Sequence, residues 1–120
     1  MAMQWNPEDA IEEFVNSPKR SAWLHFHTDA AYLKIYVRKA NHVCGHILCK
    51  TLDIASVGAY PQGTGAFTRL VDVMERIAAE HQRIVFVESI LEERLIGFLH
   101  RRGYAWQDTP GLGFSMYKPA

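Results

Sequence analysis

The segment from Tyr60 to Leu70, which reads YPQGTGAFTRL, joins a strand-like run to an amphipathic helix through a turn that contains two glycines. The first N–H groups of a helix have no partner within it, and the positive end of the helix dipole lies behind them. Such a junction suits a phosphate group, because glycine lets a ligand approach the backbone closely. We also expect a right-handed crossover from this junction to a parallel, fully buried strand at 84–87.

The pattern of apolar residues predicts the other elements. Asn6 and Pro7 mark the start of a helix, and Gly103 marks the end of another. Three strands after the first helix should pair as antiparallel hairpins, with turns at 28–30 and 39–41. We therefore predict one domain, 1–120, of the α/β class, an α+β three-layer unit whose mixed sheet is flanked by helices. The expected elements are a helix at 7–17, strands at 22–27, 32–39 and 43–57, a helix from the glycine turn to 81, a strand at 84–87, a helix at 89–103, and strands at 104–107 and 114–118.

Composition narrows the class of protein. The 120 residues include 13 basic and 13 acidic side chains, so the formal net charge is zero and no overall field attracts nucleic acid. No apolar run approaches the roughly 20 residues of a membrane span, and we expect a soluble, cytoplasmic protein without a membrane partner. Cys44 and Cys49 should lie on opposite faces of one strand, so we expect no disulfide between them.

Two motifs together resemble a known family. The run Gln62 to Phe67, with Leu70 after it, resembles the Q/R-x-x-G-x-G/A pyrophosphate loop of the GNAT N-acetyltransferase superfamily. The run 85–88, followed by a helix that closes on Gly103 and Tyr104, looks like the strand-helix segment of the same superfamily. The resemblance extends from about residue 43 to the C-terminus and implies a GNAT-like fold.

The resemblance also implies a cofactor, acetyl-CoA or another short acyl-CoA. The pantetheine arm would lie against unpaired backbone of the strand that ends near Val57, and the glycine turn would hold the pyrophosphate. The sequence departs from the family pattern at Phe67, which replaces a small residue, and at Leu99, where a tyrosine often serves as general acid. The residues that the resemblance assigns to the cofactor are Val57, Gln62, Gly63, Thr64, Gly65, Ala66, Phe67 and Thr68.

Acetyl transfer to an amine needs a base, and two carboxylates are candidates. Asp53 lies on the strand that leads to the glycine turn, on the face that we expect it to share with Ala55 and Val57. Glu88 ends the neighbouring strand, where open α/β sheets place their ligands. The alternatives are a carboxylate at a strand edge in solvent for Asp53 and an acid in the first turn of a helix for Glu88.

A metal site is a further alternative. His42, Cys44 and His46 would share one face of a strand, and two histidines with a thiolate suit zinc. In a regular strand Cys49 would face away from them, and no second cluster of histidine and cysteine follows. We therefore assign no metal, although a bulge at Gly45 would favour one.

The sequence thus predicts an acyl-CoA-dependent N-acetyltransferase that acts on a primary amine of unknown identity by direct attack. The alternative is a GNAT-like module that binds CoA or a partner without catalysis. It is favoured by the missing tyrosine at Leu99, by Glu92 where the family often has an asparagine, and by the short N-terminal part. The neutral charge disfavours nucleic acid as the acceptor. The aromatic content of the first strands makes a homodimer an alternative to a monomer.

Overall fold

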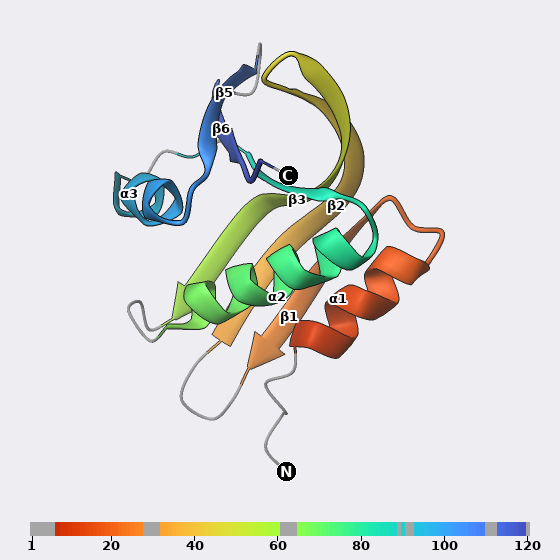
Figure 1. Ribbon diagram of the computed structural model, residues 1–120. Helices are drawn as coiled ribbons and strands as arrows, with labels where there is room; N and C mark the ends of the chain where they lie inside the picture. The colour runs from red at the N-terminus through yellow and green to blue at the C-terminus, as the bar shows by residue number, and fades with distance from the viewer. Residues whose placement is uncertain are drawn as a thin grey trace.

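A computed structural model describes residues 7–27, 32–60, 65–88, 90, 93–109 and 113–119 of the chain. These residues form an α+β protein with three helices and one six-stranded mixed sheet, in the strand order β1-β2-β3-β4-β6-β5 (Figure 1). The elements are α1 (Pro7–Asn16), β1 (Ser21–His27), β2 (Tyr32–Cys44), β3 (Ile47–Tyr60), α2 (Ala66–Glu80), β4 (Ile84–Val87), α3 (Glu93–Arg101), β5 (Ala105–Thr109) and β6 (Gly113–Tyr117).

The crossover predicted at the glycine turn is confirmed. β3 leads into α2, and β4 returns parallel to β3, with Thr51 opposite Ile84 and Ile54 opposite Val87. β4 is short and almost wholly buried, as its continuous apolar sequence predicts. The last two strands pair antiparallel to each other, and β6 rather than β5 lies beside β4.

The predicted turn at 39–41 is wrong. β2 continues to Cys44 and pairs with β3 throughout, and the chain reverses only at Gly45 and His46. Gly45 has a φ of 68°, a left-handed conformation that glycine adopts without steric cost. The sequence Lys39-Ala40-Asn41 carries turn formers but no such glycine, so the longer hairpin forms. The other expected turn, at 28–30, lies outside the described residues, and β1 and β2 are antiparallel as predicted.

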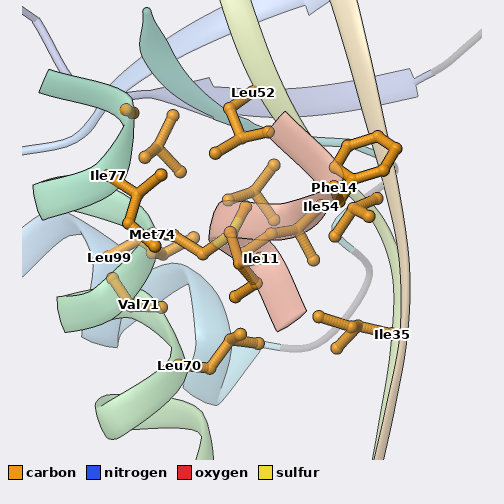
Figure 2. Packing of buried hydrophobic residues seen from close by; sticks show 14 of the residues in the cluster. Ile11, Phe14, Ile35, Leu52, Ile54, Leu70, Val71, Met74, Ile77 and Leu99 are labelled. Carbon is orange, nitrogen blue, oxygen red and sulfur yellow. The ribbon is translucent and has the colours of Figure 1, made fainter. Parts of the chain in front are cut away.

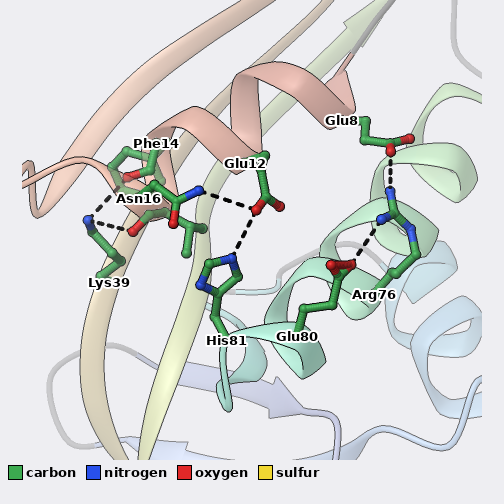
Figure 3. A network of polar contacts seen from close by, with 9 residues as sticks. Glu8, Glu12, Phe14, Asn16, Lys39, Arg76, Glu80 and His81 are labelled. Atoms are coloured by element: carbon green, nitrogen blue, oxygen red, sulfur yellow. Dashed lines mark hydrogen bonds and ion pairs between the residues drawn. The ribbon is translucent and has the colours of Figure 1, made fainter.

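The core lies between the helices and one face of the sheet (Figure 2). Helices α1 and α2 pack side by side, α1 against β1 and α2 against β3 and β4, and they also exchange exposed ion pairs such as Arg76 with Glu8 at 2.8 Å (Figure 3). Exposed pairs of this kind contribute little, so apolar burial holds the layers together. The fully buried side chains of this core include Ile11, Leu33, Ile35, Val37, Leu52, Leu70, Met74, Ile77 and Leu99.

We call the face of the sheet away from α1 and α2 the far face. Because side chains alternate along a strand, Leu52 and Ile54 in the core place Asp53 on the far face. The long β2–β3 hairpin arches over this face toward β5 (Figure 1), and the Gly45 N–H donates to Gln107 Oε1 at 2.9 Å. The hairpin tip therefore reaches β5, the strand at one edge of the sheet.

A bulge in β3 corrects one further expectation. Tyr36 pairs with Ser56 while Val37 pairs with Ile54, so Ala55 is the extra residue. The alternation of faces shifts at this point. Val57 consequently packs against the core on the helix side. An uninterrupted strand would have placed it on the same face as Asp53, so that prediction is wrong.

Candidate functional site

The two candidate carboxylates meet on the far face, where β2, β3 and β4 lie side by side. Asp53 is in register with Arg38 of β2 on one side and with Phe86 of β4 on the other. Glu88 follows Phe86 by two residues, and its backbone N–H donates to Ile54 O at 3.0 Å. The parallel pairing of β3 with β4 thus brings together two acids that are far apart in the sequence.

Two further side chains complete the cluster. Arg38 Nε lies 3.4 Å from Asp53 Oδ2, and an Arg38 terminal nitrogen donates to Glu88 Oε2. His42 Nε2 lies 2.8 Å from the same Asp53 Oδ2. The His42 ring stacks on Phe86 with a centroid separation of 3.9 Å and an interplanar angle of 8°. We call Arg38, His42, Asp53 and Glu88 the carboxylate cluster.

Burial sets the electrostatics of this cluster. The side chain of Asp53 is 0% exposed and that of Glu88 is 4% exposed, whereas that of Arg38 is 34% exposed. Burial raises the pKa of the Glu88 carboxyl above its ordinary value, and the charge of Asp53 adds to this, while Arg38 opposes it. A carboxylate with a raised pKa is a stronger base than an exposed one, which suits proton transfer near neutral pH.

The structure therefore changes the interpretation of both acids. Asp53 is fully buried, which excludes the solvent-exposed strand edge that was its alternative. Glu88 lies before α3 and is buried against Arg38, which is a different environment from the first turn of a helix. The sequence did not indicate Arg38 and His42 as partners of these acids. The turn predicted at 39–41 would have ended the pairing of β2 with β3 and separated His42 from Asp53.

The described part of the glycine turn begins at Gly65, after the C-terminal end of β3 in the chain. Gly65 is the N-cap of α2 with a φ of 82°, and a Cβ added there would meet nothing within 4 Å. α2 has no acidic residue in its first turn, so the positive end of its dipole is not neutralised locally. Thr68 is exposed beside it. Of the other expected cofactor residues, Gln62, Gly63 and Thr64 lie outside the described residues, and Ala66 is the first residue of the helix.

The departures from the family pattern at Phe67 and Leu99 are accounted for by packing. Phe67 meets Phe98 of α3 edge to face at 5.5 Å, so its ring is held between two helices. Leu99 is fully buried in the core and does not reach the far face. Val57 packs its side chain into the same core, so only its backbone remains for a ligand.

The expectations for the cysteines and for zinc are corrected by the hairpin. Cys44 ends β2 and Cys49 lies on β3, so the two are on adjacent strands and not on opposite faces of one strand. Burial raises the pKa of the Cys44 thiol to about 12, and contact with Cys49 adds to the rise. His46 is exposed in the turn and does not join His42. In the described part of the chain, the group that a metal ion would suit is His42, Asp53 and Glu88.

A cavity of about 680 Å³ lies away from the cluster. It opens at the end of α2 and the start of β4, with Ala78, Arg83 and Ile84 among its lining residues. Glu88 stands after the opposite end of β4, so this cavity and the carboxylate cluster are separate features.

Comparison with protein-family models, with curated proteins and with solved structures finds no match for this chain. Within the described residues, no helix has both the length and the apolar character that a membrane span needs. The assignment of a function must therefore start from the geometry of the cluster and of the glycine turn.

Proposed function

We propose that this protein is an acyl-CoA-dependent N-acetyltransferase with a GNAT-like fold, which moves an acetyl group from acetyl-CoA to a primary amine. One observation carries the proposal. The parallel pairing of β3 with β4 ends at Ile54 and Val87, while β3 continues to Tyr60, and α2 is the next element along the chain. An extended donor can lie along the continuing strand, with its pyrophosphate at the helix and its reactive end beside Glu88.

The cluster supplies the proton chemistry that the transfer needs. The amine nitrogen forms a bond to the thioester carbonyl carbon, the carbon–sulfur bond breaks, and the amine loses a proton. Glu88 accepts this proton, because it stands at the end of the β3–β4 pairing and its pKa is raised by burial. Asp53 is fully enclosed and holds Arg38 and His42 in place. The proton on Glu88 then passes to the departing thiolate.

The donor site is tested by a charge change at Gly65. Aspartate and asparagine have the same size and both tolerate the left-handed conformation of this position better than most residues. Calorimetry should find that wild type binds acetyl-CoA. The substitution Gly65→Asn should retain most of this binding, and Gly65→Asp should weaken it about tenfold or more because a carboxylate at the helix N-terminus repels the pyrophosphate.

Absence of acetyl-CoA binding by the folded wild-type chain would remove the proposal. Equal binding by the Asn and Asp variants would place the cofactor away from α2. Acetylation of a panel of primary amines, followed by mass spectrometry, then separates transfer from binding alone.

A non-catalytic module that binds CoA is the second candidate. It is favoured by one contact pattern, since Arg38 already ion-pairs with both Asp53 and Glu88 and thereby restrains the base. For this candidate, acetyl-CoA binds without turnover across the amine panel, and Glu88→Gln leaves cofactor affinity unchanged. Turnover that is lost in Glu88→Gln while affinity persists would favour the enzyme.

A further inference from the structure

Four buried side-chain oxygens among the described residues have no hydrogen-bond partner: Thr51 Oγ1, Asp53 Oδ1, Glu88 Oε1 and Ser115 Oγ. Folded proteins pair the large majority of such atoms, so a group of four is a signal of an additional ligand or ion. All four lie on the far face. Thr51 shares this face with Asp53 along β3, and Ser115 shares it with Tyr117, which pairs with Phe86.

The cluster on the far face also has more carboxyl groups than permanent positive charges. Asp53 and Glu88 bring two buried carboxyl groups, and Arg38 brings one guanidinium that is 34% exposed. Each carboxyl group has one oxygen engaged by Arg38 and one oxygen without a partner in the described structure. Buried charges are normally paired or bind metal, so the free oxygens favour a second cation.

The third donor is an imidazole with a fixed ring. His42, Asp53 and Glu88 each offer a ligand atom, and these atoms lie within 4.8 Å of one another. Stacking on Phe86 holds the His42 ring over the far face. One imidazole nitrogen and two carboxylate oxygens, with water at a further position, form a donor set that Zn²⁺ accepts and that Mn²⁺ tolerates.

We propose that His42, Asp53 and Glu88 bind a divalent transition-metal ion, with Zn²⁺ the best match. When the metal is absent, the positive charge of Arg38 pairs with the two carboxylates in its place. Arg38 leaves the cluster when the ion binds, since its exposed side chain can turn to solvent while the two acids remain buried. The metal and the guanidinium therefore compete for the same carboxylates.

This site differs from the zinc site that the sequence pattern suggests. That pattern groups His42 with Cys44 and His46, but His46 lies exposed in the hairpin turn, beyond the end of β2. The metal proposal does not rest on acetyl transfer, but both proposals use Glu88. Acetyl transfer with Glu88 as the base therefore belongs to the metal-free state, in which Arg38 pairs with the carboxylates. A glutamate that coordinates a metal ion has no free oxygen lone pair of comparable basicity for a proton from the amine.

Calorimetry with ZnCl₂ on the full, metal-stripped chain tests the proposal. One Zn²⁺ per chain should bind, His42→Gln and Glu88→Gln should each weaken binding about 100-fold, and Arg38→Gln should tighten it about tenfold because the competing charge is gone. His46→Gln and Cys44→Ser are the matched controls and should leave the affinity unchanged. Circular dichroism must show that each variant is folded, and two separate ligand variants guard against the failure of one.

Cobalt supplies a second readout. Co²⁺ at this site should give visible absorption bands without the near-ultraviolet charge-transfer band that a thiolate ligand produces. Three results would overturn the proposal: no Zn²⁺ binding, binding that survives both His42→Gln and Glu88→Gln, or binding lost in His46→Gln or Cys44→Ser. None of these results bears on acetyl-CoA binding at Gly65, so the two proposals fail separately.

Discussion

On the helix face of the sheet, strands β2, β3 and β4 present apolar side chains that pack against α1 and α2, whereas the same strands carry buried acids, an arginine and a histidine on the far face. The helix face is closed by layers of close-packed apolar atoms. On the far face the tip of the β2–β3 hairpin reaches β5, and the described part of this face retains four unpartnered polar atoms. The comparison indicates that one face supplies stability while the other gives up stability to hold reactive groups.

Two leucines on one strand test this division most strongly. Leu52 of β3 is 0% exposed in the core, and Leu48 of the same strand is 68% exposed. Leu52→Ala should lower the free energy of unfolding by about 2–5 kcal/mol, because it removes buried methyl groups and leaves a cavity. Leu48→Ala should change it by no more than about 0.5 kcal/mol. Urea unfolding measures both, and a similar loss for the two variants would show that the helix face is not the main source of stability.

Arg38→Gln tests the far face. Removal of the guanidinium leaves Asp53 and Glu88 buried without their cation, which should cost about 2 kcal/mol at pH 7, less than for a fully buried pair because Arg38 is partly exposed. Adding Glu88→Gln to this variant should recover part of the loss, since one uncompensated carboxylate is removed. If the double variant is less stable than Arg38→Gln, repulsion between the acids is not the cause.

Lys39 follows Arg38 on β2 and tests a polar contact on the helix face of the sheet. Its Nζ donates to the backbone oxygens of Phe14, Val15 and Ser17 at 3.1, 3.4 and 2.6 Å, which satisfies the C-terminal end of α1. Figure 3 shows Lys39 beside Phe14 at this end of the helix. Lys39→Met should therefore lower the free energy of unfolding by about 1 kcal/mol. Lys50→Met, at an exposed position of β3, is the control. Its midpoint of thermal unfolding should be close to that of wild type.

The smallest effect concerns pH. Burial raises the pKa of Glu88 above its ordinary value of 4.5, so the folded protein holds this proton more tightly than the unfolded chain. The stability that the proton contributes is fully present below pH 4.5 and is lost as the pH rises through the raised pKa. The stability of wild type relative to Glu88→Gln should thus decrease with rising pH in this range. A constant difference in urea unfolding from pH 4 to 8 would contradict the raised pKa.

The elements with strong local signals were predicted well. Pro7 with acids in the first turn marks α1, and the continuous apolar run at 84–87 marks β4. The expected crossover predicted the parallel pairing of β3 with β4, and with it the place of Glu88 at the end of the strand beside that of Asp53. These successes depend on residues adjacent in the sequence and on a rule of chain handedness.

The failures have a common cause in pairing between distant residues. Lys39-Ala40-Asn41 carries turn formers, yet the chain turns at Gly45 because β2 gains pairing with β3 over the intervening residues. The bulge at Ala55 moves Val57 to the helix face, and no local pattern announces it. The pairing register of two strands depends on the side chains of both segments, so the sequence of one segment alone does not determine it.

By itself, the sequence determined the α+β class, the starts of α1 and α2, and the buried strand β4, because each follows from local conformational preference and apolar period. The expected start of the third helix at 89 is wrong, since Ile90 is not helical and α3 begins at Glu93. Only the tertiary structure decided that Arg38, His42, Asp53 and Glu88 form one cluster. Those contacts join three strands across the sheet. Their energies depend on burial and on distances between charges, which exist only once the strands have paired.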